Sequence, residues 1–234
     1  MLILAASCAS GAPEPVPDPD LRLLFIGNSL TSANDLPGLV ARLGREDPSR
    51  SVRVESVAYG GYALQDHWVR GDALRAIQRG GWDLVILQQG PSALPESRAN
   101  LIDYTRRFAV EIRRVGVTPA LYMVWPELTR EGVWDAVTAS YQAAADAVGG
   151  VLLPAGEAIR AARATNPTLT LFDADGFHPS LAGSYAAALV IYARAAGVAP
   201  AGLTMRSGGV DLPAYYAPVL EAAAADALAR FGGP

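Results

Sequence analysis

The sequence predicts an α/β protein with a parallel sheet of about five strands and helices on both faces of the sheet. Short apolar segments that end in turn residues alternate about five times with longer segments of helical periodicity. The chain has 234 residues, of which 51% are hydrophobic, so it can bury the core of one such domain. No internal repeat or shift of composition marks a second domain after residue 20, so residues 21–234 are expected to form a single domain.

Each expected strand is short, apolar and closed by a turn signal. The first is nearly all apolar, as in a buried parallel strand, and Gly27 ends it. The second alternates valines with polar residues, the third contains the run Leu-Val-Ile-Leu, and Pro126 stops the fourth. The expected strands are residues 21–26, 51–58, 82–89, 117–125 and 151–153.

The helical segments lie between and after these strands. Pro37 suits the first turn of its helix, and Gly71 interrupts the second helical segment. The third segment is long and carries apolar residues along one face. The expected helices are residues 35–46, 63–79, 97–115, 131–148, 155–165, 180–196 and 213–231.

Residues 1–20 differ from the rest of the chain. An apolar start, small residues before Cys8 and a Pro-rich run loosely resemble a bacterial lipoprotein signal followed by an extended linker. The apolar part is short and no Lys or Arg precedes it. We expect an exported protein, whether secreted, periplasmic or lipid-anchored at Cys8; the alternative is a frayed terminus of a cytoplasmic protein.

Charge and cysteine content narrow the class of partner. The chain has 19 basic and 23 acidic residues and no basic block, so nucleic acid is not an expected partner. A single cysteine cannot form an internal disulfide or a zinc cluster. No later segment has the roughly 18 uninterrupted apolar residues of a membrane span.

The first apolar run leads directly into Gly27, Asn28 and Ser29. Ligands of open α/β sheets bind just beyond the carboxyl ends of the strands. Ser29 therefore lies where an active site is expected, although Gly-Asn-Ser is also an ordinary turn that caps a helix.

The chain has two histidines, His67 and His178. His178 follows Asp175 by three residues in a polar turn, and positions three apart can project to one side. A carboxylate there can accept the Nδ1 proton and leave Nε2 free to take a proton from the Ser29 hydroxyl. The alternative is a surface turn in which Asp175 caps the next helix. His67, beside Asp66, is interpreted as structural.

An acyl-transfer site also needs donors aimed at the developing oxyanion. The backbone N–H groups of Ser29 and Gly61 are two candidates, because both follow strand ends. A side-chain amide after the third strand is the third candidate, from Gln89 or Gln88, with Ser92 as a weaker alternative. Ordinary turns and strand-end hydrogen bonds would explain the same residues.

Two blocks of this sequence resemble the SGNH, or GDSL-like, hydrolase superfamily. Residues 27–30, Gly-Asn-Ser-Leu, resemble its nucleophile block with Asn in place of the usual Asp, and residues 175–179, Asp-Gly-Phe-His-Pro, resemble its last block. Gly61 falls at the position of the family's oxyanion glycine. The resemblance runs from Leu21 to about Ala196 and implies a three-layer, flavodoxin-like sandwich.

The third block departs from the family pattern. Residues 88–92 read Gln-Gln-Gly-Pro-Ser, without the usual Asn. A Gln-Gly version resembles the carbohydrate-esterase branches, in which a Gln amide can stand in. The resemblance thus assigns the third oxyanion donor to Gln89 and leaves Gln88 and Ser92 open.

Together these observations predict a serine esterase that needs no metal or cofactor. The resemblance implies Ser29 as nucleophile, His178 as base, Asp175 as its orienting group, and short acyl esters, chiefly acetyl groups on carbohydrate, as substrates. An acyltransferase with the same triad is one alternative, and a non-catalytic exported binding protein is another. The sequence leaves open the acyl chain, the alcohol, the oligomeric state and the true N-terminus.

Overall fold

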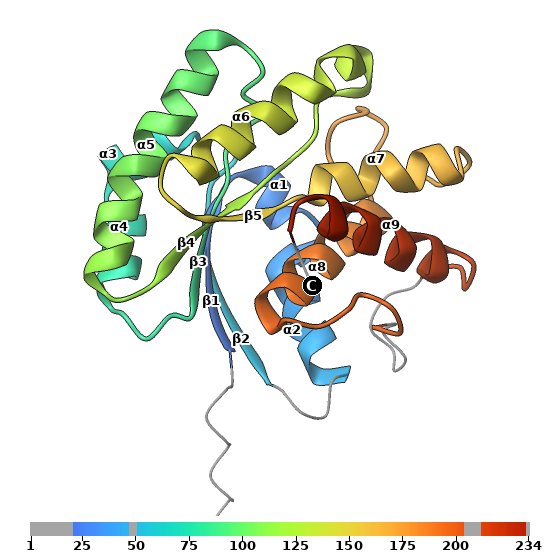
Figure 1. The fold of residues 1–234 in the computed structure, drawn as a ribbon, viewed down its shortest axis with the longest axis horizontal. Helices are drawn as coiled ribbons and strands as arrows, with labels where there is room; N and C mark the ends of the chain where they lie inside the picture. Colours follow the sequence, from blue (N-terminus) through green and yellow to red (C-terminus); the bar gives the residue numbers. More distant parts are fainter. Residues whose placement is uncertain (1–20, 47–50, 204–211, 233–234) are drawn as a thin grey trace, which may run out of the picture.

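The sheet has five parallel strands in the order β2-β1-β3-β4-β5, as the computed structural model shows (Figure 1). The structure describes residues 21–46, 51–203 and 212–232. The leader-like segment predicted for residues 1–20, with Cys8, lies outside the described residues. The strands are β1 (Leu21–Gly27), β2 (Val52–Ala58), β3 (Leu84–Leu87), β4 (Thr118–Tyr122) and β5 (Val151–Leu153).

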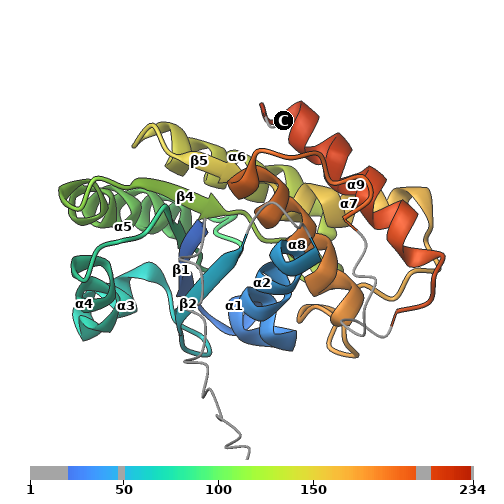
Figure 2. The same ribbon diagram turned by 90° about the horizontal axis from the view of Figure 1, so that it is seen from below.

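Helices cover both faces of this sheet, which confirms the predicted fold class (Figure 2). One layer contains α2 and α8 with α7 and α9 packed on them, and the other contains α3 to α6. The α-helices are α1 (Ser29–Ser32), α2 (Leu36–Glu46), α3 (Leu64–Arg70), α4 (Asp72–Gln78), α5 (Pro95–Arg114), α6 (Trp134–Asp146), α7 (Ala155–Thr165), α8 (Leu181–Ala196) and α9 (Tyr216–Arg230). Two 3₁₀ segments are η1 (Ala33–Asp35) and η2 (Leu128–Val133).

The core forms on both sides of β1, the strand that the sequence marks as most buried. Leu23, Leu24, Phe25 and Ile26 are all fully buried, and β1 pairs with β2 on one side and β3 on the other. Side chains of a strand alternate between faces, so a strand with helices on both faces needs apolar residues at every position. This is why the first apolar run is continuous while β2, at the edge of the sheet, alternates.

Some element boundaries differ from the sequence prediction, each for a local reason. The predicted helix over residues 63–79 divides into α3 and α4 at Gly71, whose φ is 84°. Helix α5 begins two residues earlier than expected because Pro95 suits the first helical turn. Strand β3 ends at Leu87, because the backbone of Gln89 bonds the Tyr141 hydroxyl of α6 in place of a neighbouring strand.

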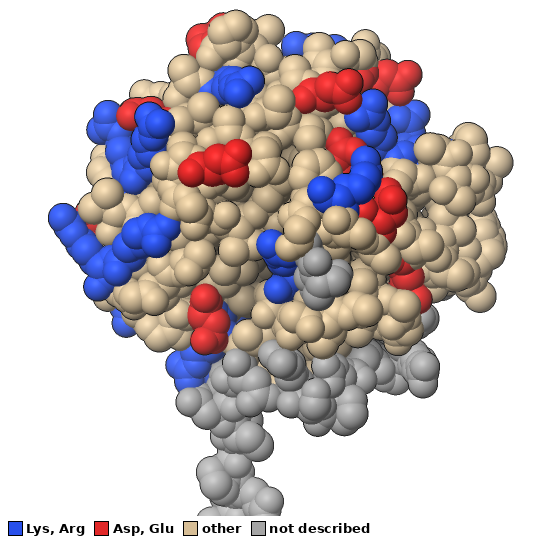
Figure 3. Space-filling view, in the orientation of Figure 1, with Lys and Arg blue, Asp and Glu red and all other residues tan. Residues whose placement is uncertain are grey.

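The face of the molecule drawn in Figure 3 is of mixed charge. Acidic and basic side chains are interspersed over the face drawn in Figure 3, without a continuous area of one sign. None of the helices in the described ranges is both long and apolar enough to cross a bilayer.

Candidate active site

The nucleophile candidate lies in a tight turn at the carboxyl end of β1. Gly27 ends the strand, the side chain of Asn28 accepts a hydrogen bond from the Leu30 N–H at 3.0 Å, and Ser29 opens the short helix α1. A Cβ on Gly27 would lie 2.2 Å from the Thr31 hydroxyl oxygen. Only glycine therefore allows the turn to close this tightly.

Gln88 holds the turn from the neighbouring strand end. Its Oε1 accepts hydrogen bonds from the Asn28 N–H and the Thr31 hydroxyl, both at 2.8 Å, and its Nε2 donates to Asn28 Oδ1 at 3.0 Å. The Gln88 side chain is fully buried. Its amide is thus turned into the protein, where it positions Asn28 and the nucleophile turn.

The structure brings Ser29, His178 and Asp175 together in one chain of hydrogen bonds. The Ser29 Oγ lies 2.9 Å from His178 Nε2, and His178 Nδ1 lies 2.6 Å from Asp175 Oδ2. With the Nδ1 proton donated to the carboxylate, Nε2 is free to accept the proton of the Ser29 hydroxyl. An imidazole held in this way can activate a serine as a nucleophile.

Asp175 is well suited to hold the imidazole. Its carboxylate accepts the hydrogen bond from His178 Nδ1 and two more from the backbone N–H groups of Phe177 and His178, each at 2.9 Å. These bonds, led by the one from the His178 ring, lower the pKa of Asp175 to about 2. Asp175 is therefore ionised at neutral pH.

Bonds from two other segments hold the loop that carries His178. After β4, Trp125 Nε1 donates to the Phe177 carbonyl and the Leu128 N–H donates to the Gly176 carbonyl, both at 2.9 Å. From η1, Asn34 Nδ2 donates to the Pro179 carbonyl at 2.8 Å. The His178 loop is thus tied both to the nucleophile segment and to the loop after β4.

Two of the expected oxyanion donors face an open cleft. The backbone N–H groups of Ser29 and Gly61 donate to no residue that the structure describes. Asn28 Nδ2 donates to the Tyr62 carbonyl at 3.0 Å, which ties the nucleophile turn to the Gly61 loop. Sequence reasoning missed this role of Asn28; its only signal was an Asn between a strand end and the candidate serine.

Gln89 reaches the same cleft, but its amide is already engaged. Oε1 accepts from the Leu64 N–H at 3.1 Å, which turns Nε2 toward the Ser92 hydroxyl at 2.9 Å and the Ser97 carbonyl at 3.5 Å. The hydroxyl of Ser92, a residue with a φ of 59°, in turn donates a hydrogen bond to the Gly90 carbonyl at 3.0 Å. The assignment of Gln89 to the oxyanion hole stays a prediction, as does the alternative, Ser92.

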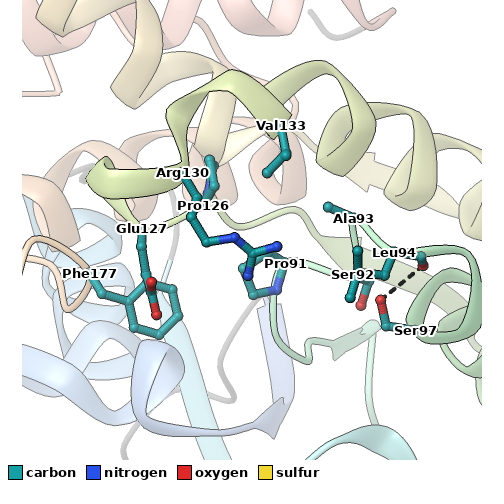
Figure 4. A pocket seen from close by; sticks show the side chains of 10 residues that line it. All are labelled: Pro91, Ser92, Ala93, Leu94, Ser97, Pro126, Glu127, Arg130, Val133 and Phe177. Atoms are coloured by element: carbon teal, nitrogen blue, oxygen red, sulfur yellow. Dashed lines mark hydrogen bonds between the residues drawn. The ribbon is translucent and has the colours of Figure 1, made fainter.

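The cleft has a volume of about 500 Å³ and contains the nucleophile at its edge. Its lining includes Ser29, Gly61, Tyr62, Gln89, Asn100 and Phe177. A smaller pocket adjoins it and shares Phe177 and Pro91 (Figure 4). Across the described ranges, no three His, Cys, Asp or Glu side chains gather as they would around a metal ion.

His67 lies behind the nucleophile turn, away from the cleft. Its ring is fully buried and packs against the rings of Tyr59 and Tyr62, and Nε2 lies 2.8 Å from the Gly27 carbonyl oxygen. Burial lowers the pKa of His67 below its usual value, so the neutral ring donates its Nε2 proton to Gly27. The structure agrees with the structural role expected for this histidine.

Comparison with known proteins identifies the family of this chain. No protein-family model matches the chain, and no curated protein matches it either. A solved structure of a protein from Slackia heliotrinireducens, assigned to the SGNH hydrolases, is 30% identical over 74% of this chain and 97% of that chain, with a TM-score of 0.61. The chain belongs to the SGNH hydrolase superfamily. By its family, the chain is accordingly a hydrolase.

Two further structures share the SGNH fold at lower identity. A DUF4886 family protein from Bacteroides uniformis is 19% identical over 89% of this chain and 95% of that chain, with a TM-score of 0.77. A catalytic mutant of Axe2, an acetylxylan esterase from Geobacillus stearothermophilus, is 16% identical over 77% of this chain and 95% of that chain, with a TM-score of 0.54. At these identities the likeness shows the fold.

Proposed function

We propose that this SGNH hydrolase cleaves short-chain acyl esters, with acetyl groups on carbohydrate as its expected substrates. The observation that carries the proposal is the hydrogen-bonded chain from the Ser29 hydroxyl through His178 to Asp175 at the edge of an open cleft. The fold shared with an acetylxylan esterase supports the choice of acyl group and alcohol.

In the proposed mechanism, the Ser29 Oγ attacks the ester carbonyl carbon while His178 Nε2 takes its proton. The tetrahedral intermediate collapses, the bond to the alcohol oxygen breaks, and the proton passes from Nε2 to the leaving alcohol. Water then attacks the acyl-enzyme with His178 again as base, which releases the acid and restores Ser29. Asp175 keeps the ring in the required tautomer throughout.

The oxyanion is held by the N–H groups of Ser29 and Gly61 together with the amide of Gln89. The second amide hydrogen of Gln89 makes only the long 3.5 Å contact with the Ser97 carbonyl, so it is the hydrogen that the amide can offer to an oxyanion. The bond from the Leu64 N–H to Oε1 keeps the amide nitrogen on the cleft side. One such donor contributes about 3 kcal/mol to transition-state stabilisation.

We further propose that the protein acts outside the cytoplasm, because the sequence before Leu21 resembles an export or lipoprotein signal. Esters on extracellular carbohydrate would then be its natural substrates.

The test is hydrolysis of para-nitrophenyl acetate by the full chain and by Ser29→Ala and His178→Ala variants. Each variant is expected to lower kcat by about a thousandfold or more while thermal unfolding is unchanged. Ser32→Ala, an exposed serine one turn further along, is the matched control and should keep full activity. Equal rates in wild type and Ser29→Ala would contradict the assignment.

A fluorophosphonate probe separates the remaining alternatives. Labelling at Ser29 without turnover of para-nitrophenyl acetate would indicate a more selective acyl donor. A folded protein that is never labelled would instead indicate a non-catalytic binding protein. Transfer of the acetyl group to an added sugar alcohol, in preference to water, would indicate an acyltransferase.

A further inference from the structure

The small pocket beside the cleft carries charges that the cleft itself lacks. It has a volume of about 130 Å³ and shares Pro91, Ser92, Ser97 and Phe177 with the cleft that contains Ser29. A substrate bound at Ser29 can therefore extend into it. Phe177 directly precedes His178, so the pocket begins one residue from the proposed catalytic base.

Arg130 and Glu127 are the only charged residues among those that line either cavity. The Arg130 side chain extends from η2 toward Pro91, while the Glu127 carboxylate lies beside the ring of Phe177 (Figure 4). Neither side chain makes an ion pair with a residue in the described ranges. The neighbouring Arg163, by contrast, pairs with Glu131 at 3.3 Å.

The backbone segment that carries these two residues is held by the same bonds that hold the His178 loop. The backbone of Leu128, between them in sequence, bonds the Gly176 carbonyl, and Trp125 Nε1 bonds the Phe177 carbonyl. The segment that carries Arg130 is therefore fastened to the segment that carries His178. The Arg130 side chain is exposed and has no acidic partner among the described residues, so a carboxylate that enters the pocket can pair with it.

We infer that this pocket is a subsite for a carboxylate on the substrate, with Arg130 as the group that binds it. This inference rests on the proposed esterase function and narrows its substrate to acidic esters. The planar fork of an arginine donates two parallel hydrogen bonds to a carboxylate, a geometry that a neutral ester cannot use. Glu127 repels the same carboxylate and confines it to the Pro91 side of the pocket.

The experiment compares pairs of esters that differ in charge. In the first pair, para-acetoxybenzoate and para-acetoxybenzamide, the carboxylate is on the alcohol, as it would be in an acidic carbohydrate. In the second pair, para-nitrophenyl hemisuccinate and para-nitrophenyl butyrate, it is on the acyl group. The quantity measured is the ratio of kcat/KM for the anionic ester to that for its neutral partner.

Arg130→Gln is expected to lower one of these ratios by about fivefold, the size of effect typical of a partly exposed ion pair. Glu127→Gln is expected to raise the same ratio by about twofold, because it removes a like charge. Added salt should lower the wild-type ratio and leave that of Arg130→Gln unchanged. The control is Arg53→Gln, which removes an exposed arginine on β2 without touching the cleft.

The pair whose ratio falls shows whether the carboxylate belongs to the alcohol or to the acyl group. The subsite is overturned if neither ratio changes more in Arg130→Gln than in Arg53→Gln. Failure of the proposed function looks different, since the neutral esters would then show no hydrolysis dependent on Ser29. In that case, calorimetric binding of para-acetoxybenzoate and of para-nitrophenyl hemisuccinate to Ser29→Ala, with and without Arg130→Gln, still tests the subsite: affinities that are equal for both esters would overturn it.

Discussion

Gln88 and Gln89 are adjacent in sequence and take opposite positions at the end of β3. Successive side chains of an extended chain point to opposite sides, so two neighbouring glutamines cannot share one task. Gln88 points inward and bonds Asn28 and Thr31, whereas Gln89 points to the cleft beside Ser92. Of this pair, Gln88 thus supports the turn that carries Ser29, and Gln89 faces the cleft.

A prediction at this scale concerns His67 and pH. Because burial lowers the pKa of His67 in the folded protein below 6.5, the unfolded chain takes up a proton first as the pH falls. The contribution of His67 to stability is therefore complete at neutral pH and is lost as the pH falls below that value. His67→Gln, which keeps a donor for the Gly27 carbonyl but does not titrate, should flatten this loss.

The measurement is the free energy of unfolding by urea at several values between about pH 7 and 5, for wild type and His67→Gln. His178 is present in both proteins, so the difference between the two curves belongs to His67. Parallel curves would contradict the proposed burial of a neutral ring.

At the scale of elements, the proposed catalytic residues come from segments that lie far apart in sequence and are joined by few bonds. Asn34 in η1 donates to the Pro179 carbonyl and to the Ser184 hydroxyl, and thereby links the nucleophile segment to the His178 loop and α8. Its φ of 52° is tolerated by Asn better than by most residues. A single side chain thus sets the spacing of two segments of the site.

Replacement of Asn34 tests this link. Asn34→Gly keeps the backbone conformation and removes only the amide, so kcat/KM for para-nitrophenyl acetate should fall by about tenfold through the looser His178 loop. Asn34→Ala should lose the same activity and in addition be less stable than Asn34→Gly by about 1 kcal/mol, because alanine must adopt a left-handed conformation. Full activity in Asn34→Gly would show that the other bonds to the loop suffice.

At the scale of the molecule, the site depends on how closely α8 packs against the segment between α7 and α8, which contains Leu171. A Cβ on Gly183 would lie 2.1 Å from the Leu171 carbonyl oxygen and 3.1 Å from the Pro179 Cβ. Pro179 follows His178 directly. The close packing of α8 against Pro179 therefore also positions the His178 loop.

Gly183→Ala should therefore reduce both stability and activity. The backbone carbonyl of Leu171 cannot move aside as a side chain could, so we expect a loss of about 3 kcal/mol in the free energy of unfolding. Gly132→Ala, where an added methyl group meets nothing within 4 Å, is the matched control for stability. Equal unfolding midpoints for the two variants would contradict this packing argument.

The sequence by itself determined the fold class and two local features of the candidate site. The apolar run before Ser29 predicted β1, because a strand covered on both faces must be apolar throughout. Asp175 and His178 were predicted together, because three residues of turn bring two side chains to one side. These are local rules, and local rules can be read from neighbouring residues.

Only the tertiary structure decided how the distant parts meet. It placed His178 Nε2 2.9 Å from the Ser29 hydroxyl, turned Gln88 inward and brought Arg130 to the pocket beside the cleft. No local rule could give these results, since each depends on how strands and loops separated by tens of residues pack across the edge of the sheet. Gln88 and Gln89 have the same chemistry and the same local preference. Only that packing therefore decides which of the two amides faces the cleft.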